Sequence, residues 1–315
     1  MDLHQIQIFC TVIKLRSFSK AAEELYLTQP TVSGHIKNLE QEIGVKLLDR
    51  LGKQVMPTEA GDVLFRHGQE LLALRDRTEE EIASMTGQVR GLLKIGGSTI
   101  PGAYILPSII GAFKKQHPST TIQLLIDDTT KIAQAVLNGD LHLGVVGAPM
   151  TDPQLVSYPY LLDELVIAVP AMHAWAKKRI ITPDALHGAP FILRESGSGT
   201  RRIMEERLGK AGISITDLNT IAVMGSSDAV RQSIKGGLGI SILSIRAIHD
   251  DIVAKRLAAV RVKGVPIERS FSIILRKGKS RSPLCQTFFN SLLKAKPDAC
   301  LSAVPSHNFK IISGP

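Results

Sequence analysis

Residues 17–44 of the chain read SFSKAAEELYLTQPTVSGHIKNLEQEIG, two helical segments separated by a short break at 26–27. The apolar residues of the second segment recur every three or four positions, at Val32, Ile36, Leu39 and Ile43. This spacing places them on one face of a helix. Thr28 offers an N-cap and Gly44 a stop. Two short helices joined by a tight turn are typical of the helix-turn-helix arrangement.

The flanking segments extend this arrangement. Residues 3–13 show the same helical spacing, and residues 45–57, VKLLDRLGKQVMP, fit two short strands around a turn, a wing. From Thr58 to about residue 88 helical character persists, with an apolar seam at Val63, Leu64, Leu71, Leu74, Ile82 and Met85. A helix of about 30 residues is roughly 45 Å long. An apolar edge on so long a helix favours pairing with a second copy over packing on its own domain.

Beyond Gly91 short apolar segments alternate with amphipathic helical ones. Strands are expected at 92–96, 122–127, 143–147, 165–169, 191–194, 221–224, 240–243 and 270–275. Helices are expected at 106–116, 131–138, 200–210, 228–235 and 284–294. Alternation of this kind predicts parallel sheets covered by helices.

Composition indicates a folded chain without a membrane segment. Its 315 residues are 44% hydrophobic and 21% charged, which excludes intrinsic disorder. The longest uncharged apolar stretch, 95–113, contains prolines and glycines and is therefore not a span. The start MDLHQIQIF has no basic n-region, and the three cysteines are too far apart for a disulfide or metal pattern. We expect a cytoplasmic protein that needs no metal and no cofactor.

The net charge of +9 invites a nucleic-acid interpretation. Its distribution does not support that interpretation by itself. Residues 1–90 hold 11 basic and 13 acidic residues, whereas residues 91–315 hold 27 and 16. Any argument for DNA binding must therefore rest on the local placement of side chains.

The helix that begins after Thr28 provides such a placement. Its apolar face is turned inward, so hydroxyl, amide and ammonium groups occupy the opposite face, where they can meet base edges and phosphates in a major groove. Basic residues of the wing can reach flanking phosphates. The candidate DNA contacts are Gln29, Pro30, Thr31, Ser33, Lys37, Arg50 and Lys53. An ordinary exposed helix would also be polar here.

Four segments together carry a resemblance to a known family: SFSKAAEEL, TQPTVS, HIKNLEQEIGVKLLDR and PTEAG. Their order and spacing resemble the N-terminal module of LysR-type transcriptional regulators, and the length and α/β pattern of the rest agree. The resemblance implies a multi-domain α+β chain that binds promoter DNA and self-associates as a dimer or tetramer. One departure is Gly34, where many members carry arginine, so base reading would rest more on Gln29, Thr31, Ser33 and Lys37.

The resemblance also implies a domain plan with a helix-rich winged helix-turn-helix domain, a long linker helix and a two-lobed α/β effector domain similar to type 2 periplasmic binding proteins. The expected segments are 1–58 for DNA binding, 59–89 for the linker and dimerisation helix, 90–296 for the effector domain and 297–315 for a tail. Within the effector domain, lobe I is expected at about 90–163 and 268–296, and lobe II at about 164–267.

Two turns of the C-terminal part are rich in hydrogen-bond donors: GGSTIPGAYILP at 96–107 and RESGSGTRR at 194–202. Helix N-termini bind anions because their first amides lack partners, and Arg194 or Arg201 would add local charge. Such turns also occur simply as connections. The candidate effector contacts from these turns are Ser98, Thr99, Gly102, Ser198, Gly199 and Thr200. The resemblance adds Thr129 and Gly147 and places the pocket between the lobes.

The turns favour a small anionic effector, an oxyanion or a carboxylate. Similarity of RESGSGTR to sulfur-oxyanion sensors of the family makes sulfate or sulfite the first candidate, with aromatic carboxylates second. An enzyme is not expected, because GSGTRR lacks the third glycine of the dinucleotide fingerprint and no G-x-S-x-G, P-loop or H-E-x-x-H motif is present. The alternative is a free-standing solute-binding or enzymatic α/β domain that does not bind DNA.

Overall fold

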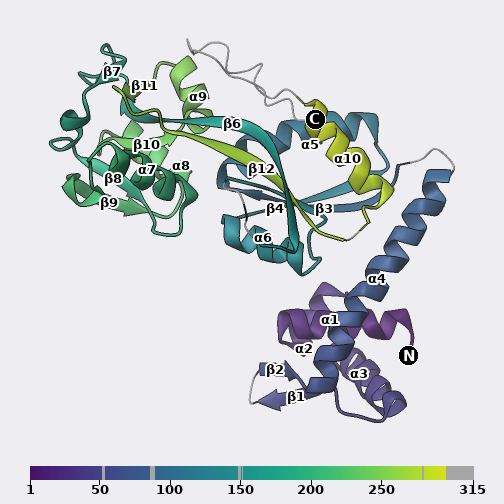
Figure 1. Ribbon diagram of the computed structural model, residues 1–315. Coiled ribbons are helices and arrows are strands. Elements are labelled where there is room, and N and C mark those ends of the chain that lie inside the picture. Colours follow the sequence, from purple (N-terminus) through teal and green to yellow (C-terminus); the bar gives the residue numbers. More distant parts are fainter. Residues whose placement is uncertain (52–53, 86–88, 148–149, 151, 279, 296–315) are drawn as a thin grey trace. The chain divides into compact units, whose positions relative to one another are not determined.

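The computed structural model describes residues 1–51, 54–85, 89–147, 150, 152–278 and 280–295, with the backbone alone at 50, 51, 54, 80 and 84. The chain divides into two compact units, Met1–Gln88 and Val89–Pro315. Each unit is described by itself below and drawn in Figure 1.

The first unit is a small helical domain with a two-stranded wing. Its elements are α1 (Leu3–Leu15), α2 (Phe18–Glu24), α3 (Gln29–Ile43), β1 (Leu48–Leu51), β2 (Gln54–Pro57) and α4 (Glu59–Met85). Local chemistry sets the boundaries of α3: the Thr28 hydroxyl accepts from the Thr31 amide at 3.3 Å, and Gly44 ends the helix with φ 83°. Strands β1 and β2 pair antiparallel, from Leu48 opposite Pro57 to Leu51 opposite Gln54. The expected winged helix-turn-helix is therefore present.

Helix α4 packs one face on α1 and exposes another. Leu64, Phe65 and Leu72 contact the apolar core of this unit. Gly68 permits the close approach, because a Cβ there would lie 2.9 Å from Ile6 Cγ2 and 3.1 Å from Cys10 Sγ. On the exposed side lie Val63, Leu71, Leu74, Ile82 and Met85. Leu64 therefore belongs to the core of the unit and not to the exposed seam.

The second unit contains the remaining helices and strands. The strands are β3 (Gly91–Ser98), β4 (Thr120–Asp127), β5 (Leu143–Val146), β6 (Leu155–Pro170), β7 (Ile180–Ile181), β8 (Phe191–Arg194), β9 (Thr220–Met224), β10 (Ser241–Ser244), β11 (Leu257–Val262) and β12 (Glu268–Arg276). The helices are α5 (Leu106–Gln116), α6 (Thr129–Leu137), α7 (Gly199–Lys210), α8 (Ser227–Lys235), α9 (Ile245–Val253) and α10 (Pro283–Lys294). Short helical turns are η1 (Pro101–Ile105), η2 (Pro183–Leu186) and η3 (Ile215–Asp217).

The sheets are mixed, so the expectation of purely parallel sheets is wrong. Strand β3 is parallel to β4 and β5, and β8 is parallel to β9. However, β6 pairs antiparallel with β10, β11 and β12. The apolar pattern indicated only five of the 16 residues of β6 and did not indicate β11, so the antiparallel pairings of these strands were not expected. Leu155, Tyr160 and Leu161 of β6 are buried, but the half-buried and exposed residues between Leu155 and Tyr160 interrupt the apolar run.

Strands β6 and β12 connect two lobes. Figure 1 shows them running side by side from one lobe into the other. Tyr160 and Leu161 of β6 belong to a core with α5 and α10, the core of the first lobe, whereas Leu165 and Ile167 pack with β8 and α7 in the second lobe. The segment near Asp163 therefore lies between the two cores.

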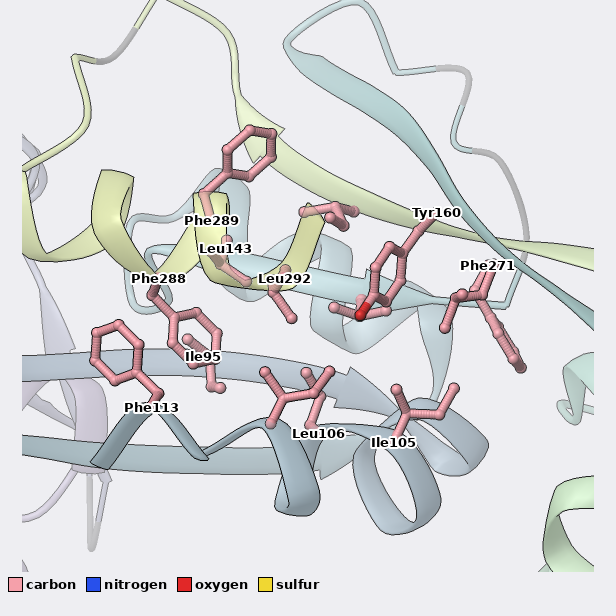
Figure 2. Packing of buried hydrophobic residues seen from close by; sticks show 14 of the residues in the cluster. Ile95, Ile105, Leu106, Phe113, Leu143, Tyr160, Phe271, Phe288, Phe289 and Leu292 are labelled. Atoms are coloured by element: carbon pink, nitrogen blue, oxygen red, sulfur yellow. The ribbon is translucent and has the colours of Figure 1, made fainter. Parts of the chain in front are cut away.

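The first lobe is held by interdigitated aromatic and aliphatic side chains (Figure 2). The rings of Phe113 and Phe288 meet edge to face with centroids 5.0 Å apart, joining α5 to α10. Phe271 of β12 is fully buried in the same cluster. This packing makes the first lobe a rigid support for the turns that follow β3 and β5.

Sequence reasoning missed α9 and β11. The reason is the turn between them, where Lys255 adopts φ 55°. This left-handed conformation is normally marked by glycine or asparagine, so no breaker residue separates the two elements in the sequence. None of the helices among the described residues has the length and hydropathy that a membrane span requires.

Candidate functional site

The exposed face of α3 carries most of the candidate DNA contacts. Val32, Ile36 and Leu39 are buried, and this turns the opposite face to solvent. The exposed candidates there are Gln29, Pro30, Thr31 and Lys37, while Ser33 is half-buried. The Thr31 hydroxyl lies 2.8 Å from that of Thr28, so it takes part in the cap as well as facing outward.

The wing follows α3 through a turn that Glu40 holds. Its carboxylate accepts from the backbone amides of Leu47 at 2.9 Å and Leu48 at 3.3 Å, and from Lys46 Nζ at 2.6 Å. Burial alone would raise the pKa of Glu40, but these hydrogen bonds outweigh it and lower the pKa below its usual value. Of the wing candidates, Lys53 and the side chain of Arg50 lie outside the described residues.

Sequence reasoning overlooked Tyr26, which precedes this helix. Its side chain is 95% exposed and its backbone has φ 55°. This exposed aromatic side chain lies two residues before Thr28, the N-cap of α3.

Turns from both lobes line a pocket in the second unit. The pocket is open to solvent and has a volume of about 370 Å³. The first lobe contributes Ser98, Thr99, Ile100, Asp128, Thr129 and Gly147. The second contributes Arg194, Glu195, Gly197, Ser198, Gly199 and Thr200, and Arg269 of β12 completes the lining. The structure thus brings together seven of the eight candidate effector residues, the exception being Gly102.

Gly102 lies beneath the first-lobe turn and is absent from the lining of this pocket. A Cβ on the neighbouring Gly97 would lie 2.5 Å from Gly102 Cα. Both glycines therefore allow two backbone segments to pass closely, which fixes the path of Ser98 and Thr99 into the pocket. The role of Gly102 is one of backbone packing.

Helix α7 presents its N-terminus to the pocket. Ser198 is the N-cap, and its side chain accepts from the Arg201 amide at 3.5 Å. Thr200, in the first turn, is 4% exposed. The first amides of a helix have no intrahelical acceptor and carry the positive end of the dipole, so this end of the pocket suits an anion.

Arg194 and Arg201 of the 194–202 segment are each paired with a neighbouring acid. Arg194 donates to both carboxylate oxygens of Glu195, at 2.7 and 2.6 Å, and Arg201 donates to Glu205 at 2.8 Å. Burial of Glu195 opposes ionisation, but the adjacent Arg194 outweighs it and lowers the pKa of that carboxyl. The expected contribution of Arg194 or Arg201 is therefore corrected: each is neutralised by a neighbouring acid.

Arg269, which sequence reasoning missed, is a second arginine that lines the pocket. Its Nε donates to Asp163 Oδ2 at 2.8 Å and its Nη1 to Thr200 Oγ1 at 3.4 Å. The guanidinium carbon lies 4.9 Å from the centre of the Phe271 ring. A sequence signal existed, since Arg269 is in phase with Phe271, Ile273 and Leu275 on an otherwise apolar strand face.

We looked for a metal site among the described residues. No group of three or more His, Cys, Asp or Glu side chains that could hold a metal ion occurs there. The pocket instead offers hydroxyls, helix amides and a guanidinium, which are donors for an anionic small molecule.

A chain that contains a winged helix-turn-helix unit and a two-lobed unit with a donor-lined pocket has the domain content of a ligand-responsive DNA-binding regulator. Family models agree: residues 3–62 match the bacterial regulatory helix-turn-helix protein of the lysR family, and residues 86–297 match the LysR substrate binding domain. The chain belongs to the LysR family, which consists of transcriptional regulators and not of enzymes.

Individual relatives extend over nearly the whole chain. The HTH-type transcriptional activator CmpR of Synechocystis sp. strain PCC 6803 is 34% identical over 290 residues, covering 92% of this chain and 94% of that protein. A full-length OxyR variant from Pseudomonas aeruginosa is 21% identical, with a TM-score of 0.70 over 95% of each chain. The regulatory domain of Synechocystis PCC6803 CcmR, solved in complex with 2-PG, is 28% identical, with a TM-score of 0.60 over 65% of this chain and 97% of that one.

Proposed function

We propose that this protein is a cytoplasmic transcriptional regulator in which a small anion, bound between the two lobes of the effector domain, changes how the winged helix-turn-helix binds promoter DNA. In this proposal residues 1–58 bind DNA, 59–89 link and dimerise, and 90–296 sense the effector, ahead of a tail at 297–315. The observation that carries it is the pocket itself, whose hydrogen-bond donors come from both lobes.

For DNA binding, the proposal rests on the exposed groups of α3. Gln29 offers an amide that suits adenine in the major groove, and Lys37 offers a charge for phosphate or guanine. Lys37 is exposed and forms no ion pair with the described residues of the unit. These groups predict sequence-specific binding that weakens steeply with salt, since each phosphate contact releases counterions.

The DNA-binding test uses the full-length chain and fragmented genomic DNA from its host. Fragments retained at about 0.1 M salt are sequenced, and the affinity for the most enriched one is measured at two salt concentrations by anisotropy. Enrichment of a few fragments with a steep salt slope supports the proposal. Uniform retention of all fragments contradicts sequence-specific binding, and retention of none contradicts DNA binding and favours a free-standing solute-binding domain.

For effector binding, the proposal rests on Ser98 and Thr99 in one lobe and on Ser198, Gly199 and Thr200 in the other. An anion that accepts from both sets stabilises the closed arrangement of the lobes by its preference for closed over open. Thr129 and Gly147 border the same pocket. In this proposal, closure of the effector domain is passed on to the DNA-binding unit, whose last helix, α4, precedes the effector domain in the chain.

The effector test is calorimetric titration of the full-length protein with sulfate, sulfite, 2-PG and benzoate. The 2-PG arm is included because the similar CcmR domain is solved with it. Thr200→Val and Ser98→Ala should weaken the anion that binds best, while Ser119→Ala, an exposed hydroxyl outside the pocket, serves as the control. If no anion binds, or both variants bind as well as wild type, the site is wrongly assigned.

Self-association through α4 completes the proposal. Leu71, Leu74, Ile82 and Met85 are 40–86% exposed along one helix, and their spacing of three, eight and three residues keeps them on one stripe. An apolar stripe of this length is covered when two copies pair. We propose a dimer through this contact, with a tetramer as the larger assembly that family resemblance suggests.

A further inference from the structure

We infer that Arg269 is the specificity-determining residue of the pocket: it pairs with an anionic group of the effector and thereby restricts the effector to molecules that carry one. Asp163 acts as the positioning residue that holds this guanidinium in place. The inference rests on the proposed effector function, because it assigns the ligand class of the same pocket.

The geometry of Arg269 leaves one edge of its guanidinium for a ligand. Arg269 and Asp163 stand directly opposite each other in the antiparallel pair of β12 and β6, which explains the short bond of Nε to the carboxylate, 2.8 Å. Nη1 reaches Thr200 at 3.4 Å. Nη2 is buried without a hydrogen-bond partner among the described residues, on a side chain that is only 5% exposed.

Several donors share the carboxylate of Asp163. Arg246 Nε approaches Asp163 Oδ1 at 3.7 Å, so two guanidinium groups share one carboxylate, which itself has no exposed surface. The Ser244 hydroxyl also donates to Oδ1 at 2.6 Å. Asp163 bonds Arg269 through Nε, while Nη2 of the same guanidinium has no hydrogen-bond partner among the described residues. A buried polar group is costly unless it is paired, and an anionic ligand beside Arg269 supplies a partner.

The open space next to Arg269 lies where the two lobes meet. A Cβ added to Gly147 would be 3.4 Å from Arg269 Nη1 and 3.7 Å from Ser98 Oγ. The bare glycine therefore leaves room between a hydroxyl of the first lobe and the guanidinium, with Thr200 of α7 adjoining. A carboxylate or a tetrahedral oxyanion placed there accepts two parallel N–H bonds from the fork of one guanidinium.

The test compares two arginines that share Asp163 but differ in access to the pocket. Arg269→Gln removes the charge that lines the pocket, whereas Arg246→Gln removes the other charge on the same carboxylate, and Arg246 is not among the lining residues. Full-length proteins are titrated calorimetrically with sulfate, inorganic phosphate and 2-PG. We expect Arg269→Gln to weaken the best of these anions about 10- to 100-fold, the range of a charge-assisted hydrogen bond. Arg246→Gln should change it less than about threefold.

Arg269→Lys gives a second measurement. This variant keeps a positive charge at position 269, so Asp163 keeps a cationic partner. Lysine lacks the planar fork, so its affinity should fall between wild type and Arg269→Gln. Thermal unfolding of each variant checks that the effector domain is folded.

Each outcome decides the inference. Binding by Arg269→Gln within threefold of wild type overturns the assignment of Arg269 and leaves the proposed effector function standing. An equal loss in Arg246→Gln also overturns it, because the effect would then come from the Asp163 cluster and not from contact with the anion. If no anion binds wild type, the proposed effector function and this inference both fail.

Discussion

Replacing Glu40 by alanine should loosen the junction between the recognition helix α3 and the wing. Two backbone amides, those of Leu47 and Leu48, are buried and bonded to this carboxylate. Leaving a buried donor unpaired costs about 1–3 kcal/mol. The Lys46 contact adds little, because the lysine is 76% exposed and exposed pairs contribute about 0–1 kcal/mol. With two such donors, we expect a destabilisation of about 2–6 kcal/mol in Glu40→Ala.

Hydrogen–deuterium exchange on the full-length chain measures this effect at the site. A loss of 2 kcal/mol corresponds to about 30-fold faster exchange of the two amides. Glu24→Ala, which removes an exposed carboxylate from α2, should leave their exchange unchanged. Unchanged protection of Leu47 and Leu48 in Glu40→Ala would refute the reasoning, since it would show that the carboxylate does not hold this turn.

The pH dependence of the same contact has a definite sign. The pKa of Glu40 is lowered in the folded chain, below the value of about 4.3 that an unfolded glutamate has. Its stabilisation is therefore complete at neutral pH and is lost as the pH falls below about 4 through the folded pKa. In urea titrations the free-energy difference between wild type and Glu40→Gln should shrink over that range. A difference that is the same at pH 7 and pH 3 would contradict the lowered pKa.

Three further predictions concern the other parts of the molecule. Leu71→Asp with Leu74→Asp would bury charge in the proposed dimer contact, so sedimentation should show a smaller species, and an unchanged mass would exclude α4 as the contact. Lys37→Ala should weaken binding to all DNA sequences and reduce the salt slope by about one, whereas an unchanged slope would show that it meets no phosphate. Gly97→Ala would place a Cβ 2.5 Å from the backbone at Gly102. Overpacking should therefore lower the free energy of unfolding by about 1–3 kcal/mol, measured by thermal unfolding. It should also weaken anion binding, as Thr200→Val does.

The sequence alone determined the first unit and the local frame of the pocket. The Thr28 cap, the apolar spacing of α3 and the glycine stop act within a few residues of one another, so periodicity and capping rules are sufficient to place the helix and its outward face. The same holds for the turn at Ser198, because a capping hydroxyl followed by glycine marks the start of α7. The five lining residues that were proposed from such turns are Ser98, Thr99, Ser198, Gly199 and Thr200, whereas Thr129 and Gly147, which also line the pocket, were proposed from the family resemblance.

Only the tertiary structure decided the charge of the pocket. Arg194 and Arg201, the arginines nearest the turn in sequence, are paired with Glu195 and Glu205, one and four residues away. Arg269 faces the pocket because β12 pairs with β6. This pairing brings Arg269 to Asp163, which lies 106 positions earlier in the chain, and to Thr200, which lies 69 positions earlier. That register depends on a long antiparallel pairing and on the packing of both lobes, and local sequence patterns carry no record of it. Cross-strand pairing, not sequence proximity, therefore brings Arg269 into the lining of the pocket.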